Sequence, residues 1–63
     1  MFVYANLLGT WTLLNEHDLI ESKHPVDFIS NDLMDYNEHN KFVKVIHNNQ
    51  NFFIHISQIQ FTN

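Results

Sequence analysis

The sequence predicts one small domain, residues 1–63, that is all-β or mostly β: a small barrel or a strongly curled antiparallel sheet of five to six strands. Three observations support this prediction. Sixty-three residues are too few for two domains. Short runs of β-branched and aromatic residues alternate with polar ones, as strands do. The chain has no Cys, so a dense aromatic core or a second subunit must stabilise it in place of disulfides.

The first third of the chain predicts two strands. Residues 10–13 alternate polar and apolar, and Gly9 before them indicates a bulge or a tight bend. Residues 19–20 resume the apolar pattern after a polar turn, and we expect this strand to pair back on the first. Trp11 lies in the middle of residues 10–13 and is expected to be buried, so its replacement by alanine should cost about 3–5 kcal/mol.

The middle third is ambiguous between strand and helix. We favour a short strand at residues 26–30, followed by a loop or one helical turn through residues 33–34. The alternative is a helix with Pro25 at its first position. The apolar face of this helix would hold only Val26, Ile29 and Leu33. The polar residues 30–32 also favour turns over the interior of a helix. Residues 35–40 are polar and are expected to form an exposed connection.

The last third predicts a β-hairpin. Two β-branched and aromatic runs, residues 41–47 and 52–57, flank the Asn-rich segment 48–51. Asn tolerates the left-handed conformations that tight turns need. A turn centred on residues 49–50 pairs Val45 with Ile54, and a turn centred on residues 48–49 shifts the pairing. Both registers leave the same side chains on each face, because side chains alternate with a period of two.

The two faces of this hairpin differ in character. One is wholly apolar and is predicted to be core; it holds Val43, Val45, Phe52, Ile54 and Ile56. The other is only half polar, whereas a solvated face is polar throughout. It is covered by the rest of the curled chain, or it binds a protein or a second copy, or it stacks a ligand or nucleic acid. The candidate partner-binding residues on it are Phe42, Lys44, Ile46, Phe53 and His55.

The alternation changes phase between Ser57 and Ile59, which predicts a bulge or a 3₁₀ turn. The segment 55–61 resembles the end of SH3-like barrels, where a strand enters a 3₁₀ turn and a last strand closes the barrel. The resemblance implies an SH3-like architecture. The segment 54–59, Ile-His-Ile-Ser-Gln-Ile, also resembles the third strand of S1-type RNA-binding domains. That resemblance implies that His55 and Phe53 contact RNA.

Charge and motif content exclude several functions. The net charge is −4 and Arg is absent, which disfavours a general phosphate-backbone binder. No nucleophile or phosphate-loop motif is present, and no enzyme activity is expected. Asn-Glu-His-Asp at 15–18 and Asn-Glu-His-Asn at 37–40 offer metal-ligand chemistry, but adjacent side chains on a strand point apart. No metal or cofactor is therefore expected. The acidic residues at 32, 35 and 38 are expected to form a solvated loop, or a patch for a basic partner.

These observations predict a non-enzymatic β module that binds a protein, most simply a second copy in a homodimer. The alternative function is a nucleic-acid-binding small barrel that uses Phe53, His55 and Lys44. The first residues lack a basic stretch and no apolar run could span a membrane, so a cytoplasmic protein is expected. Nine asparagines suggest an AT-rich genome, such as that of a bacterium or a phage.

Overall fold

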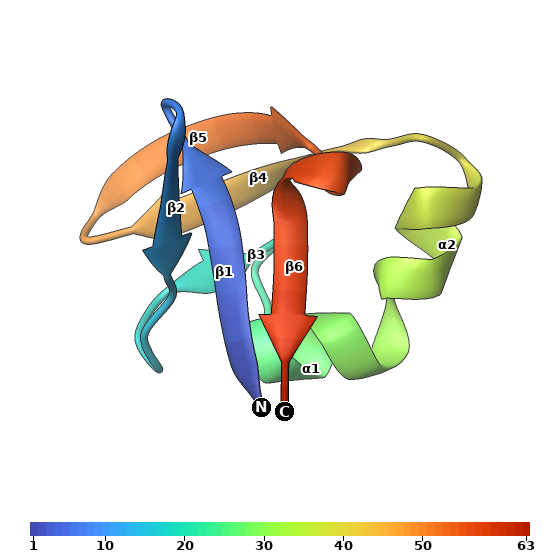
Figure 1. The fold of residues 1–63 in the computed structure, drawn as a ribbon, viewed down its shortest axis with the longest axis horizontal. Helices are drawn as coiled ribbons and strands as arrows, with labels where there is room; N and C mark the ends of the chain where they lie inside the picture. The colour runs from blue at the N-terminus through green and yellow to red at the C-terminus, as the bar shows by residue number, and fades with distance from the viewer.

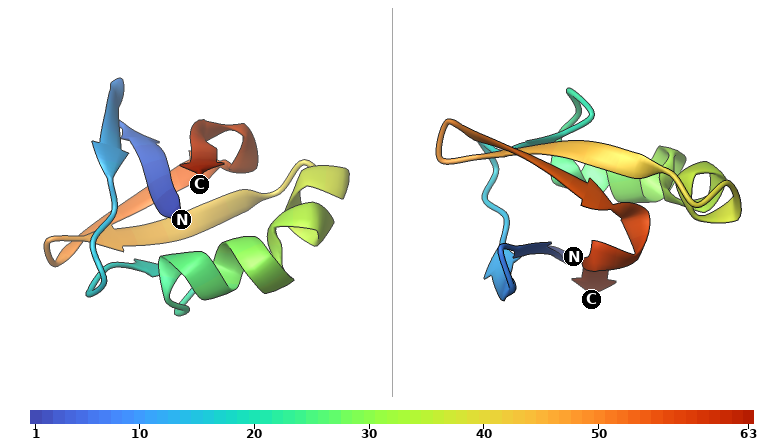
Figure 2. Two further views of the ribbon diagram at one scale, coloured as in Figure 1. Left: turned by 60° about the horizontal axis from the view of Figure 1, so that its bottom comes forward. Right: turned by 90° about the horizontal axis from the view of Figure 1, so that it is seen from above.

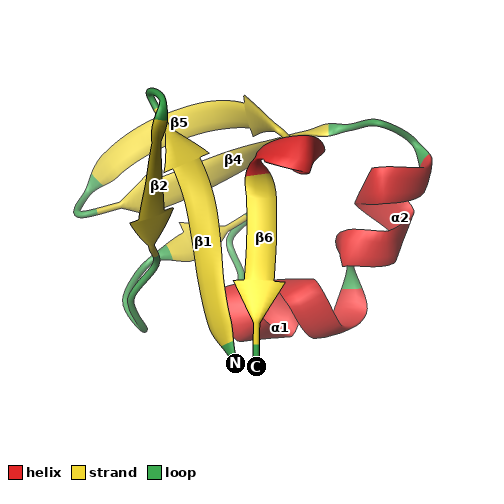
Figure 3. Cartoon of the chain, in the orientation of Figure 1, coloured by secondary structure: helices red, strands yellow, loops and turns green.

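The structure, a computed structural model, describes all residues 1–63 and is mostly β, with 46% of residues in strands and 25% in helices. Figure 1 shows the path of the chain and Figure 3 its secondary structure. The elements in order are β1 (Phe2–Leu7), β2 (Thr10–Leu13), β3 (Leu19–Ile20), α1 (Pro25–Asn31), α2 (Leu33–Glu38), β4 (Phe42–His47), β5 (Gln50–His55), the 3₁₀ turn η1 (Ile56–Gln58) and β6 (Ile59–Thr62).

The strands form two three-stranded antiparallel sheets in place of one curled sheet. The first has the order β2-β1-β6 and the second β3-β4-β5. The mostly-β prediction is confirmed, but the sheets do not close into a barrel. Residues 19–20 do form a strand, yet it pairs with β4 and not with the first strand. Figure 2 shows how the β5–η1–β6 segment crosses from one sheet to the other.

The core lies between the inner faces of the two sheets, and α1 lies against β1 and β3 at the open side. The strands β1, β4 and β5 contribute alternate side chains to it, as the pleat requires. The inner hairpin face that the sequence predicts as core is confirmed, with Val43 and Val45 fully buried. The buried apolar residues are Val3, Ala5, Leu7, Leu14, Ile20, Phe28, Ile29, Val43, Val45, Ile56 and Ile59.

The strand predicted at residues 26–30 is wrong, because this segment is the helix α1. Pro25 takes its first position, and the His24 ring caps it by accepting a hydrogen bond from the Val26 N–H at 3.2 Å. The buried face of α1 is built on Pro25, Phe28 and Ile29. Phe28 packs edge-to-face on Tyr36 of α2, with the ring centroids 5.1 Å apart. Residues 33–34, expected to form a loop or one helical turn, and residues 35–38, expected to belong to an exposed connection, form the helix α2. Its Tyr36 packs against the core.

The β4–β5 hairpin is confirmed, with its turn centred on Asn48 and Asn49. Both residues have positive φ, at 50° and 65°, as a tight two-residue hairpin turn requires. The register pairs Val45 with Phe52 and His47 with Gln50. The second of the two predicted registers is therefore the correct one, and the membership of the two faces is as predicted.

The phase change after Ser57 is the predicted 3₁₀ turn, η1. It redirects the chain so that β6 pairs antiparallel with β1, with Ala5 opposite Ile59. This pairing brings the two ends of the chain side by side (Figure 1).

The β1–β2 turn carries an avoidable strain. It consists of Leu8 and Gly9, with φ of 54° and 87°. Glycine adopts this conformation freely, whereas a branched side chain in it costs about 1–2 kcal/mol. Leu8 is 91% exposed, so little packing offsets the cost.

Replacing Leu8 with Asn is expected to stabilise the fold by about 0.5–1 kcal/mol, because Asn-Gly is the preferred pair for this turn. In dilute solution the melting temperature should rise by roughly 3–6 °C for a domain of this size. Leu8→Ala is the control, since it shortens the side chain and keeps the strain. An unchanged melting temperature for Leu8→Asn would show that the turn is not strained.

Candidate functional site

The five predicted site residues lie together on the outer face of the β4–β5 hairpin, which we call the hairpin face. The register places Phe42 opposite His55, and Lys44 opposite Phe53. Ile46 lies one pleat further along β4, where Leu19 of β3 is its neighbour on the same face. Its aromatic part is open to solvent, since Phe53 is 73% exposed and Phe42 is 53% exposed. Ile46 and His55 are partly buried.

The aromatic rings of the hairpin face contact one another. Phe42 and Phe53 are stacked, with ring centroids 5.7 Å apart and planes 14° apart. The His55 ring meets Phe42 edge-on, at 5.2 Å and 85°. Each ring limits the movement of its neighbour, so the exposed rings form a preformed apolar platform.

Hydrogen bonds fix the orientation of His55. Its Nδ1 accepts from the Ser57 backbone N–H at 3.1 Å and lies 2.9 Å from the Ser57 hydroxyl. Because Nδ1 accepts, the ring proton lies on Nε2 in the neutral tautomer. His55 and Ser57 form no nucleophile–base pair with an oriented third group, and the Nε2–H donor is left for a partner.

Lys44 is the only lysine outside an ion pair. Lys23 pairs with Asp32, and Lys41 pairs with Asp35 at 3.5 Å. The backbone N–H of Lys44 donates to the Glu21 carboxylate at 2.6 Å, while its ammonium group remains in water. The hairpin face therefore offers two aromatic rings, one unpaired cation and one imidazole N–H donor.

A second exposed apolar face lies on the outside of the β2-β1-β6 sheet, which the sequence did not predict. The prediction that Trp11 is buried is wrong: it is 44% exposed. The register places Trp11 opposite Asn6, whereas Thr12 lies opposite the fully buried Ala5. The inner side of β2 is thus the threonine side, and Trp11 shares the outer side with Leu13.

Asp18 is the only buried charged residue, and it joins two distant turns. Its carboxylate accepts from the Asn15 N–H at 2.9 Å, the Asn48 N–H at 3.3 Å and His47 Nδ1 at 2.7 Å. Burial by itself raises the pKa of Asp18, but these hydrogen bonds outweigh burial and hold the pKa below its usual value. The other nitrogen of His47 faces the Asn48 side-chain amide at 3.2 Å. The pair therefore holds the two turns together.

The two Asn-Glu-His segments do not assemble a metal centre. His17 and Glu16 are exposed and lie 3.7 Å apart, whereas His39 contacts Asp35 on its own helix. No group of three or more His, Asp or Glu side chains is placed to hold a metal ion. The predicted acidic loop is part of α2, and Asp32 and Asp35 are paired with lysines.

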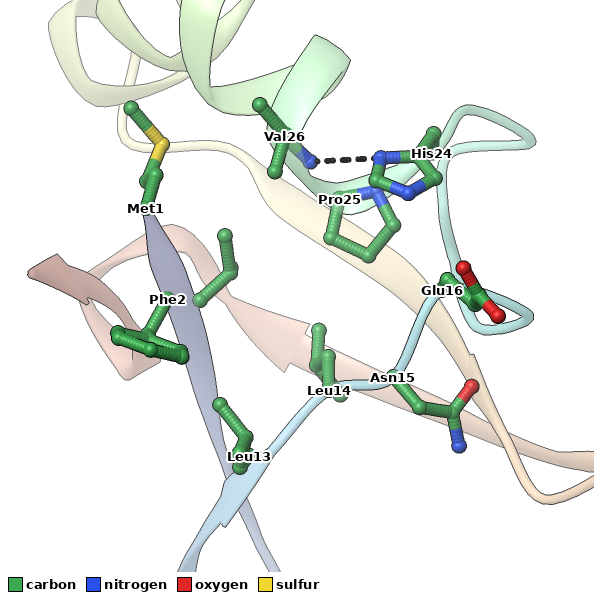
Figure 4. Close-up of a pocket in the computed structure, with 10 residues that line it drawn as sticks. Met1, Phe2, Leu13, Leu14, Asn15, Glu16, His24, Pro25 and Val26 are labelled. Atoms are coloured by element: carbon green, nitrogen blue, oxygen red, sulfur yellow. Dashed lines mark hydrogen bonds between the residues drawn. The ribbon is translucent and has the colours of Figure 1, made fainter. Parts of the chain in front are cut away.

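An open cavity of about 270 Å³ lies beside the first residues of β1, against the start of α1 (Figure 4). Its walls are mostly apolar and include Phe2 and Leu13 from the outer face of the sheet. Glu16 and His24 line it on the polar side. The His24 ring is already engaged as the cap of α1.

Comparison of the chain with protein-family models, with curated proteins and with solved structures finds no match. No helix in the structure combines the length and the apolar character needed to cross a membrane.

Proposed function

We propose that this chain is a non-enzymatic binding module, an opened small barrel of SH3-like type, that binds another protein through the hairpin face. The observation that carries the proposal is the exposed Phe42–Phe53 stack beside the only unpaired lysine. Aromatic side chains contribute most to protein–protein binding when they are held rigid at the centre of a contact.

The chemistry of the face defines the partner. The stacked rings fit an apolar side chain, and Lys44 with the His55 Nε2–H fits a carboxylate next to it. A second copy of the chain fits this face less well, because it would bring the two unpaired lysines towards each other. The partner we propose is therefore a different protein that presents an aromatic or aliphatic side chain next to Asp or Glu.

Nucleic acid is the second candidate, since stacked rings beside a lysine also suit unpaired bases. The charge argues against it, because one unpaired lysine on a chain of net charge −4 neutralises few phosphates. We expect no saturable binding of a fluorescent oligouridine at low salt. Binding that falls steeply with added salt and is lost in Phe53→Ala would establish nucleic acid as the ligand.

Selection from a random peptide library displayed on phage tests the protein-binding proposal. Peptides that carry an aromatic or aliphatic residue next to Asp or Glu should be enriched on the immobilised protein. Synthetic versions should bind Phe53→Ala at least about tenfold more weakly, as expected for a lost anchor. Lys44→Gln should weaken only the peptides that contain the carboxylate.

Met34→Ala is the matched control, because Met34 is an exposed apolar side chain on α2, away from the hairpin face. It should leave peptide affinity unchanged. Enrichment of peptides that bind Phe53→Ala as tightly as the unmodified protein would disprove the assignment of this face. Far-UV circular dichroism of each variant shows whether lost binding reflects lost folding.

A further inference from the structure

The charged side chains of this protein are strongly segregated. All seven acidic residues and all three lysines lie between Glu16 and Lys44. The strands β1, β2 and β6 lie outside that stretch, so the β2-β1-β6 sheet carries no charged side chain on either face. The rest of the molecule carries the whole net charge of −4.

The outer face of this sheet is mostly apolar on β2 and β1, where Asn6 is its one polar member, and polar on the edge strand β6. The register lays Leu13 and Trp11 of β2 beside Tyr4 and Asn6 of β1. We call the following set the sheet face: Phe2, Tyr4, Asn6, Trp11, Leu13, Gln60 and Thr62. Its large apolar members remain about half exposed. Depletion of charge together with enrichment in Trp, Tyr and Phe distinguishes the centre of a protein interface from ordinary surface.

Leu8 extends this uncharged surface at the tip of the β1–β2 turn. An Asn there would adopt the positive φ at a lower cost and would remove an exposed apolar side chain, so the turn itself does not require leucine. A strained residue that the fold does not need points to a role in contact with another molecule. The cavity lined by Phe2 and Leu13 lies at the opposite end of the same two strands (Figure 4).

We propose that the sheet face, together with Leu8, packs against the same surface of a second copy to form a two-fold dimer. In such a dimer the same surface of both copies forms the interface. A charged side chain near the two-fold axis would therefore lie close to the identical charge of the other copy. A face without charged side chains lets two copies of this acidic molecule meet without that repulsion. The hairpin face, with its unpaired Lys44, lies outside this contact and stays available.

A stable dimer would need most of one side of this small molecule. A stable interface covers about 800 Å² of each partner. That is about a fifth of the 4197 Å² exposed by this chain, or close to one side of a molecule measuring 28 × 22 × 20 Å. The dimer therefore needs the whole outer side of the sheet, including the Leu8 tip and the Phe2–Leu13 end.

The two ends of the sheet face indicate how the copies are arranged. A two-fold axis that lies in the interface and crosses β1 at right angles stacks the strands of the two copies antiparallel. The Leu8 tip of one copy then lies over the Phe2–Leu13 end of the other, where the mostly apolar cavity opens with Glu16 on its polar side. By symmetry this contact between a Leu8 tip and a Phe2–Leu13 end occurs twice, once at each end of the dimer.

Dilution of the unmodified protein tests the proposal without any substitution. Trp11 is the only tryptophan, so its fluorescence reports directly on the sheet face. Between about 100 μM and about 0.1 μM, the sedimentation mass should fall from dimer to monomer, and the Trp11 emission should shift to the red with the same midpoint. A monomer at the highest concentration, or a dimer that dissociates without a change in Trp11 emission, would overturn the proposal.

Variants separate this face from the hairpin face. Trp11→Asp and Leu8→Asn should each weaken the dimer at least about tenfold, whereas Phe53→Asp should leave the dimer constant unchanged. Leu8→Asn is the sharper test, because it is expected to raise the stability of the monomer, so its effect cannot come from unfolding. Dimerisation unchanged in Leu8→Asn, or lost in Phe53→Asp, would show that the copies meet elsewhere. The peptide selection on the hairpin face is decided independently of either result.

Discussion

Replacing Phe28 with alanine is expected to cost about 3–5 kcal/mol, which removes most of the stability of a domain of this size. Phe28 is the largest fully buried side chain, with 0% exposure, and it holds α1 against both sheets. Its ring also supports Tyr36 edge-to-face, so α2 loses its anchor as well. We expect thermal and urea unfolding to lose their cooperative transition, and the far-UV signal to fall.

Trp11→Ala is the matched control, because it removes a larger aromatic side chain from a surface position. In dilute solution it should cost no more than about 1 kcal/mol, since much of the ring is already in water. If Trp11→Ala unfolds the domain while Phe28→Ala melts normally, the core lies on the other side of the β2-β1-β6 sheet from where the structure places it.

Replacing Asp18 with alanine is the second large effect, expected at about 3–5 kcal/mol. Removal of one member of a buried hydrogen-bonded pair leaves its partners without acceptors. Here three donors would lose theirs: two backbone N–H groups and His47 Nδ1. Chemical denaturation of Asp18→Ala beside Asp18→Asn measures the loss. The Asn variant retains one acceptor oxygen and should be affected less.

The same carboxylate makes stability depend on acid. The folded pKa of Asp18 is lowered below its unfolded value, so its contribution is complete above the unfolded pKa of about 4. Below that value the unfolded chain binds the proton more readily, and stability falls until the folded pKa is passed. Asp18→Asn has no proton to bind and should show a flatter profile below pH 4. If the unmodified protein and Asp18→Asn lose stability in the same way below pH 4, Asp18 is not the cause of the acid sensitivity.

The hairpin and its faces could be predicted because their information is local. Alternation with a period of two assigns each side chain between Phe42 and His55 to a face, and Asn48 with Asn49 supplies the turn. The same local pattern identified the five residues of the hairpin face. The sequence could not decide between a turn at Asn48–Asn49 and one at Asn49–Gln50, because both are plausible tight turns. The packing of the two strands against the rest of the fold decides between them.

The helix and the sheet face depend on distant parts of the chain. The pattern of Val26, Ile29 and Leu33 looked too sparse for a helix, because the true buried stripe runs through Pro25, Phe28 and Ile29. Alternation around Trp11 showed which residues share its side, but not which side faces inward. That is decided by Ala5, which is buried opposite Thr12, and by β6 pairing with β1 from the far end of the chain.

The pairing of β1 with β6 also affects how the protein is made. The side-chain amide of Asn6 donates a hydrogen bond of 2.8 Å to the side-chain oxygen of Gln58, 52 positions further along the chain. Pairing β1 with β6 therefore requires the closure of a loop that includes nearly all of these residues. Such distant contacts slow folding compared with a local hairpin. During synthesis the β4–β5 hairpin can form as soon as its two strands have left the ribosome. Until β6 has emerged, the edge of β1 that pairs with β6 stays unpaired, and the aromatic side chains of β1 stay in water.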